Sequence, residues 1–84
     1  MAEVEGRVIA VLGRAALVPT PLLERHKPLR DLGIGSLEQI ECILALEDEF
    51  EVELPDRNLR QLHTVQDLVD FVTAAVTERN TNRR

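Results

Sequence analysis

Aromatic residues are almost missing from this sequence, which contains two Phe and neither Tyr nor Trp. A β-sandwich usually packs more aromatic side chains into its core, whereas Leu, Val, Ile and Ala suit packed helices. The apolar residues of this chain are mostly of that aliphatic kind. Its 84 residues are enough for one domain with a modest core. We therefore expect a single all-α domain.

Cysteine and long apolar runs are scarce too. Cys42 is the only cysteine, so no internal disulfide can form and a reducing, cytoplasmic setting is expected. Charged residues interrupt the apolar stretches before they reach the length of a membrane span. The acidic start, residues 1–5, lacks the basic residues of a secretory signal. These features predict a cytoplasmic protein without membrane insertion.

Basic residues are absent from one long stretch. From Asp31 to Asp56 there are nine acidic residues and no Lys or Arg, although the net charge of the chain is only −5. Such clustering repels nucleic acid and attracts basic protein surfaces. A solvated helix face would also explain an acidic run, but the length and purity of this one favour recognition by basic partners.

Apolar residues at helical spacing predict three long helices, at about residues 3–16, 36–51 and 64–76. Several prolines and glycines make residues 17–35 a long connection, and residues 55–62 could form one or two helical turns. The expected fold class is therefore an all-α four-helix bundle with a long loop between helices 1 and 2 and a short third helix. Residues 1–76 form the expected domain, and residues 77–84 an expected flexible basic tail. The predicted buried stripe of the second helix is Leu37, Ile40, Ile43, Leu44 and Phe50.

Two positions carry helix-start signals. Ser36 with Gln39 matches a capping box, in which two side chains satisfy free backbone N–H groups of the first turn. Thr64 opens the last helix, and Asp67 three residues later favours its dipole. An isolated serine at such a position is usually only an N-cap. The helix start beside Ser36 also favours a negative group such as a phosphodiester.

The residues around Ser36 resemble the attachment motif of acyl carrier proteins. Asp31-Leu32-Gly33 is followed by Ser36-Leu37, as in that family, where Asp-Leu-Gly precedes Asp-Ser-Leu at the start of the second helix. The resemblance continues without a gap to about Val72, through the acidic end of the second helix and the Thr64 helix start. The first helix fits in kind but not by motif.

The resemblance implies a fold, a cofactor and a set of partners. A phosphopantetheinyl transferase would move a 4'-phosphopantetheine arm from coenzyme A onto Ser36, and the arm would carry an acyl or aminoacyl group as a thioester. Acyl-loading and acyl-processing enzymes with basic patches would dock on the second helix. We expect a monomeric carrier, not an enzyme. The partner-binding residues expected on that helix are Leu37, Ile40, Glu41, Glu47 and Asp48.

One departure from the family concerns the residue before the serine, which is Gly35 here and usually Asp. Its loss points to a dedicated transferase or to less efficient modification, and glycine would let the backbone adopt a positive φ. We therefore favour a carrier for a specialised lipid, polyketide or related pathway. A general fatty-acid carrier and an interaction module that kept the fold but lost the arm are the alternatives.

Other candidate sites are weaker. His26 and His63 have no companions at metal-ligand spacing, so no metal site is expected. Cys42 lies within the second helix without a neighbouring catalytic His, which indicates a small packing residue. The carboxylates are numerous, but no feature buries a pair of them for acid–base catalysis.

Overall fold

The computed structural model describes residues 2–54 and 62–81 of the chain. Within them the fold consists of three α-helices, α1 (Ala2–Ala16), α2 (Ser36–Phe50) and α3 (Val65–Thr81), and two short 3-10 helices, η1 (Thr20–Leu22) and η2 (Leu29–Leu32). The described ranges contain no strand, only an isolated bridge between Pro28 and Thr64. The all-α prediction is therefore confirmed. The predicted short third helix falls mostly on residues 55–61, outside the described part of the chain, so the four-helix count stays a prediction.

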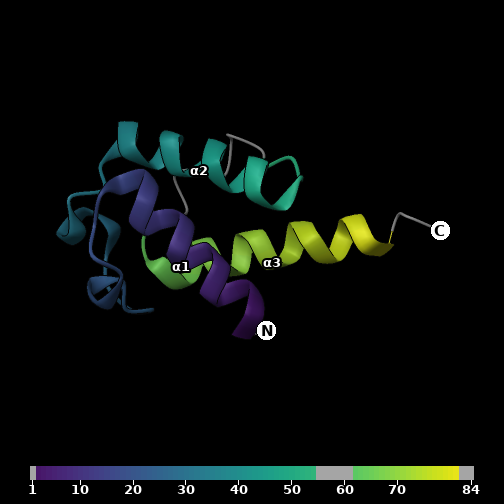
Figure 1. The fold of residues 1–84 in the computed structure, drawn as a ribbon, viewed down its shortest axis with the longest axis horizontal. Coiled ribbons are helices and arrows are strands. Elements are labelled where there is room, and N and C mark those ends of the chain that lie inside the picture. The colour runs from purple at the N-terminus through teal and green to yellow at the C-terminus, as the bar shows by residue number, and fades with distance from the viewer. Residues whose placement is uncertain (1, 55–61, 82–84) are drawn as a thin grey trace.

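The core lies where α1 meets the other two helices. In Figure 1, α2 and α3 run along the long axis of the molecule and α1 crosses them obliquely, packing against both. The apolar side of α1 is buried as its periodicity predicts, with Val8 and Leu12 fully inaccessible to solvent. Leu46 of α2 and Leu68 of α3 are equally inaccessible. None of the described helices is long and apolar enough to cross a membrane.

The connection between α1 and α2 is held down along its length. The Arg25 side chain binds the Glu5 carboxylate of α1 with a shortest N–O distance of 2.7 Å. Backbone bonds then join the connection to the start of α3: Leu29 N–H donates to His63 O at 2.8 Å, and Gln66 N–H donates to Arg25 O at 2.9 Å. Because these bonds fix η2 beside the start of α3, the residues that precede α2 are anchored as well.

The last helix is longer than its apolar pattern. The apolar pattern predicted a helix end near Val76, but α3 continues to Thr81. That residues 77–84 form a flexible basic tail stays a prediction. The expectation placed the helix end too early because it relied on apolar periodicity, which stops at Val76. A polar final turn can persist when it makes contacts of another kind, and Arg79 supplies such contacts, as described below.

Candidate functional site

The turn that leads into α2 is built from two buried anchors and one glycine. Leu29 and Ile34 are each about 2% exposed, and Ile34 N–H donates to Leu29 O at 3.0 Å. Between them, Gly33 ends η2 in the left-handed conformation with a φ of 77°. That conformation costs an L-residue roughly 1–2 kcal/mol, so glycine is favoured here. The turn therefore presents the next residues, Gly35 and Ser36, from a fixed base.

Ser36 is the first helical residue of α2, and the N-cap is Gly35. The predicted capping box of Ser36 with Gln39 is therefore wrong by one residue. Instead, Glu38 Oε1 accepts a hydrogen bond from Gly35 N–H at 3.0 Å. Gly35 itself has a φ of −84°, so it does not use the positive φ that glycine allows; in this turn the positive φ is at Gly33. Ser36 is exposed, and within residues 2–54 and 62–81 no hydrogen bond is found for its hydroxyl, which leaves this group accessible for chemistry.

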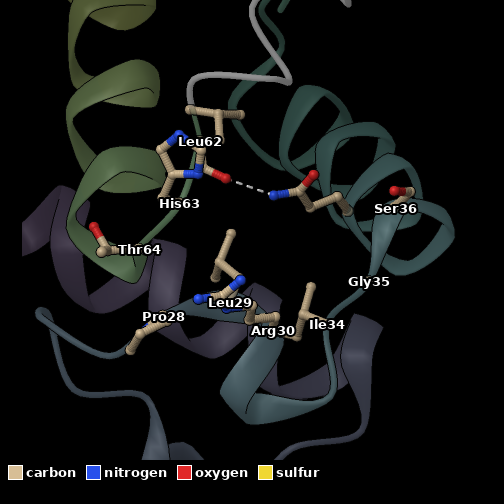
Figure 2. A pocket seen from close by; sticks show the side chains of 10 residues that line it. Pro28, Leu29, Arg30, Ile34, Gly35, Ser36, Leu62, His63 and Thr64 are labelled. Carbon is tan, nitrogen blue, oxygen red and sulfur yellow. Dashed lines mark hydrogen bonds between the residues drawn. The ribbon is translucent and has the colours of Figure 1, made fainter.

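Gln39 has a different role from the predicted one. Its Nε2 donates to the backbone carbonyl of Leu62 at 2.7 Å, which ties α2 to the segment that leads into α3. Figure 2 draws this bond as a dashed line running to the Leu62–His63 segment. Sequence patterns could not predict this bond, because the partner of Gln39 is a backbone carbonyl 23 residues away.

The start of α3 is capped as predicted. Thr64 Oγ1 accepts from Asp67 N–H at 3.2 Å, and Asp67 Oδ2 accepts from Thr64 N–H at 3.0 Å and from His63 N–H at 2.8 Å. The His63 N–H bond is the main cause that lowers the pKa of Asp67 below its usual value. This carboxylate therefore adds stability above its unfolded-state pKa, and that stability is lost as the pH falls through the lowered native pKa.

An open pocket of about 650 Å³ lies beside Ser36. Its lining comes from three segments. These are residues 28–30, 34 and 35 of the connection, Ser36 and Gln39 of α2, and residues 62–64 before α3. Figure 2 shows Ser36 on one side of this pocket and His63 and Thr64 on the other. Its apolar lining residues Leu29, Ile34 and Leu62 are themselves buried, so the pocket lies directly on the core.

The comparison with protein families agrees with this geometry. The model of the phosphopantetheine attachment site matches residues 6–72, which include all of α2 and the pocket residues. The chain belongs to the phosphopantetheine attachment-site family. The resemblance to acyl carrier proteins is thereby confirmed, and 4'-phosphopantetheine is the covalent cofactor. Domains of this family are generally carriers, and they interact with phosphopantetheinyl transferases and acyl-processing enzymes.

The residues of this attachment-site domain fit such an arm at the start of α2. The Ser36 hydroxyl is exposed, and the first N–H groups of an α-helix have no partner within the helix, so they favour an anionic group there. A Cβ on Gly35 would lie 3.1 Å from Glu38 Oε1, so the space around the N-cap is limited mainly by one mobile carboxylate. Ser36 is also the only serine in the chain.

The outer face of α2 in this attachment-site domain is apolar as well as acidic. Leu37, Ile40 and Leu44 are 67%, 44% and 60% exposed, so their predicted place in the buried stripe is wrong. For Leu37 and Ile40 the exposure is compatible with the other predicted role, contact with partners. The core positions of the helix are Cys42, Ile43, Leu46 and Phe50. The periodic pattern could not separate these two sides, because α2 has apolar residues on both of them.

The acidic residues predicted to bind partners differ in their surroundings. Glu41 and Asp48 are exposed, in keeping with their expected place on the outer face. Glu47 is only half-exposed, and its Oε2 accepts from Leu54 N–H at 2.8 Å, so this carboxylate holds the chain that leaves α2. Glu49 is paired with Arg7 at 3.0 Å. The acidic stretch therefore contains both structural and solvent-facing carboxylates.

Cys42 is buried in the core, in agreement with the predicted packing role. Burial is the main cause that raises the pKa of its thiol to about 11, with smaller contributions from Glu41 and Glu38. Since the thiolate is the reactive form, this thiol is a poor nucleophile at neutral pH.

Arg79 of α3 is a residue that the sequence analysis missed. Its Nη1 donates to Phe50 O at 2.8 Å and to Glu51 O at 3.3 Å, so it caps the carboxyl end of α2. Glu51 has a φ of 54°, and Arg79 therefore stabilises a helix end that lacks the usual glycine. A basic residue in the last turn of a helix was the only available signal, and it does not specify a partner.

Proposed function

We propose that Ser36 is the attachment residue and that the protein is a carrier that presents an acyl or aminoacyl group to partner enzymes. The observation that carries this proposal is the exposed Ser36 at the amino end of α2, whose hydroxyl has no hydrogen bond to the part of the chain that the structure describes. When bound, the arm supplies a terminal thiol that holds the cargo as a thioester. The protein itself supplies the anchored turn, the helix start and the docking face.

The docking face that we propose consists of the exposed apolar residues of α2 and the acidic residues beside them. Their spacing along the helix places Leu37, Ile40 and Leu44 on one side, with Glu41 and Asp48 next to it. Apolar contact would supply affinity, and the carboxylates would orient a basic partner during encounter. Glu47 is not included, because its carboxylate already accepts a bond from Leu54 N–H.

We further propose a cargo from a specialised lipid, polyketide or related pathway. Two observations support this proposal over a general fatty-acid carrier. Gly35 replaces the carboxylate that the family usually has before the serine. The bond from Gln39 to Leu62 O also joins α2 to the segment before α3 at the lining of the pocket, and we propose that it limits the entry of a long hydrocarbon chain there.

Intact mass spectrometry tests the attachment. The protein and its Ser36→Ala variant are incubated with coenzyme A and a broad-specificity phosphopantetheinyl transferase. We expect the mass of one arm on the native chain and none on the variant. Because Ser36 is the only serine, an adduct that survives in Ser36→Ala would place the arm elsewhere and contradict the proposal. No adduct with any of several transferases, and none on protein isolated from its own host, would support an interaction module without an arm.

The test variant should fold normally. Its hydroxyl makes no capping bond, so we expect Ser36→Ala to change the free energy of unfolding by less than about 0.5 kcal/mol. An unfolded Ser36→Ala would therefore show that the hydroxyl has a structural role. Urea unfolding followed by circular dichroism makes that check.

A further inference from the structure

The pocket beside Ser36 has a basic side. Arg30 of η2 and His63 of the segment before α3 both line it, and both side chains are exposed. In Figure 2 the two residues approach the pocket from separate segments, with Ser36 across from His63. The apolar part of the lining comes from Pro28, Leu29, Ile34 and Leu62. The pocket thus offers an apolar floor and a cationic edge within reach of one attachment point.

Arg30 differs from the other arginines that the structure describes. Arg7 and Arg14 pair with Glu49, and Arg25 pairs with Glu5. Arg79 donates to backbone carbonyls at the end of α2. Within residues 2–54 and 62–81, no hydrogen bond or ion pair is found for the Arg30 guanidinium.

Acidic residues follow this arginine along the chain. Asp31 begins the stretch without a base that runs through α2, and Glu38 lies in the first turn of that helix. A free anion would be repelled by this stretch, but an anion delivered covalently at Ser36 would be held beside the cation. A guanidinium presents a planar fork of donors that suits phosphate and carboxylate oxygens.

We propose that this pocket binds an acidic group of the loaded arm through Arg30, with His63 as a second donor. This inference rests on the proposed attachment at Ser36. The acidic group is either the phosphodiester, which every loaded form carries, or a carboxylate at the end of a short cargo. The Gln39–Leu62 bond bounds the pocket toward the helices, so a short acidic cargo fits it better than a long hydrocarbon chain.

Nuclear magnetic resonance separates these two sources. Four forms are compared: unmodified protein, protein with the free arm, and protein loaded with pentanoyl or with glutaryl, which have equal chain length but differ in the terminal carboxylate. The readouts are the backbone amide shifts of Gly35, His63 and Thr64 and the phosphorus shift of the arm. Each form is made with the native chain, with Arg30→Gln, and with Lys27→Gln as a control that removes a nearby positive charge outside the pocket lining.

The two sources predict different patterns. Binding of the phosphodiester moves the amide signals as soon as the arm is attached, whatever the cargo, and gives the arm phosphorus of the native chain a shift that differs from that in Arg30→Gln. Binding of the cargo carboxylate moves the amide signals with glutaryl and not with pentanoyl. In both cases Arg30→Gln removes most of the shift, Lys27→Gln keeps it, and added salt reduces it because the group is exposed.

Shifts that are the same in the native chain and in Arg30→Gln would overturn the inference while leaving attachment at Ser36 intact. Equal losses in Arg30→Gln and Lys27→Gln would also overturn it, since they would reflect net charge alone. Failure to form any arm on Ser36 would instead overturn the proposed function, and this inference with it. Arg30→Lys, which keeps the charge but loses the planar fork, should retain a smaller shift than the native chain.

Discussion

The two ends of α2 are used in different ways. At its amino end, Ser36 and Leu37 are exposed, and the pocket opens beside them. At its carboxyl end, Arg79 caps the last carbonyls, and Arg7 binds Glu49. One helix thus has a free end that is available to partners and a tied end that belongs to the bundle. This difference shows that acidic residues close together in sequence have different roles, because Glu49 is paired within the fold whereas Glu41 and Asp48 face solvent.

The tied end depends most on Arg79. Replacing it in Arg79→Met keeps much of the apolar stem but leaves the carbonyls of Phe50 and Glu51 without their charged donor. A hydrogen bond to a charged group contributes about 1.5–3 kcal/mol, so we expect a loss in that range in urea unfolding. Arg14→Met is the matched control, since its side chain is 72% exposed and its ion pair is long at 3.7 Å. Equal effects of the two variants would show that the cap contributes nothing specific.

Arg7 gives the next largest effect. It binds Glu49 through two nitrogens at 3.2 and 3.0 Å, and its guanidinium carbon lies 4.4 Å from the centre of the Phe50 ring. Exposed ion pairs contribute about 0–1 kcal/mol and exposed cation–π contacts about 0.5–1 kcal/mol. We expect Arg7→Gln to lower the free energy of unfolding by about 1 kcal/mol and to leave the rate of arm attachment unchanged. A slower attachment at equal stability would mean that the tied end also contacts the transferase.

The exposed carboxylates of α2 should affect the rate at which the transferase associates with the protein, and not the stability of the fold. Reversing Glu41 and Asp48 to Lys should slow arm attachment at low salt, because these carboxylates no longer attract the basic surface of the transferase. We expect a decrease of about tenfold, the lower end of the range for electrostatic steering of association. Stability should change by less than about 0.5 kcal/mol. Asp70→Lys with Glu78→Lys on α3 provides the same change in net charge on another helix. If both pairs slow attachment equally, only the net charge matters and the docking face is not on α2.

Gly35 gives the smallest expected effect. Gly35→Asp restores the family's carboxylate at a position with ordinary backbone angles, so no left-handed strain is involved. We expect a faster initial rate with a general transferase and a change in stability of only a few tenths of a kcal/mol, because Gly and Asp differ little as N-caps. The added Cβ has to displace Glu38 Oε1 slightly. An equal or slower rate under matched conditions would show that the missing carboxylate does not limit modification.

Much of this molecule could be predicted from periodicity and short motifs. The buried side of α1, the Thr64 start of α3 and the packing of Cys42 followed from local spacing and composition. The family followed from the residues around Ser36, and the family comparison confirms it. These features depend on residues that lie within a few positions of one another.

The features that were predicted wrongly depend on contacts between distant segments. The outer position of Leu37, Ile40 and Leu44 follows from where α1 lies, and apolar character alone does not encode that. The last turn of α3 is held by Arg79, which donates to the backbone carbonyls of Phe50 and Glu51 at the end of α2, 29 and 28 residues away. The capping register differs because Gly35 is the N-cap of α2, which makes Glu38 the residue that accepts from Gly35 N–H, while Gln39 donates to Leu62 O, 23 residues away.

The most direct test of the contrast between the two ends of α2 is a map of amide shift changes as a transferase is added to the unmodified protein without coenzyme A. The account predicts that the largest changes lie on residues 36–44 and at Asp48, the exposed face beside the attachment serine. The tied end around Glu49 and Phe50, together with Arg79, should change little. Changes centred on α1 or on the last turn of α3, with residues 36–44 unaffected, would contradict the assignment of the amino end of α2 as the functional end.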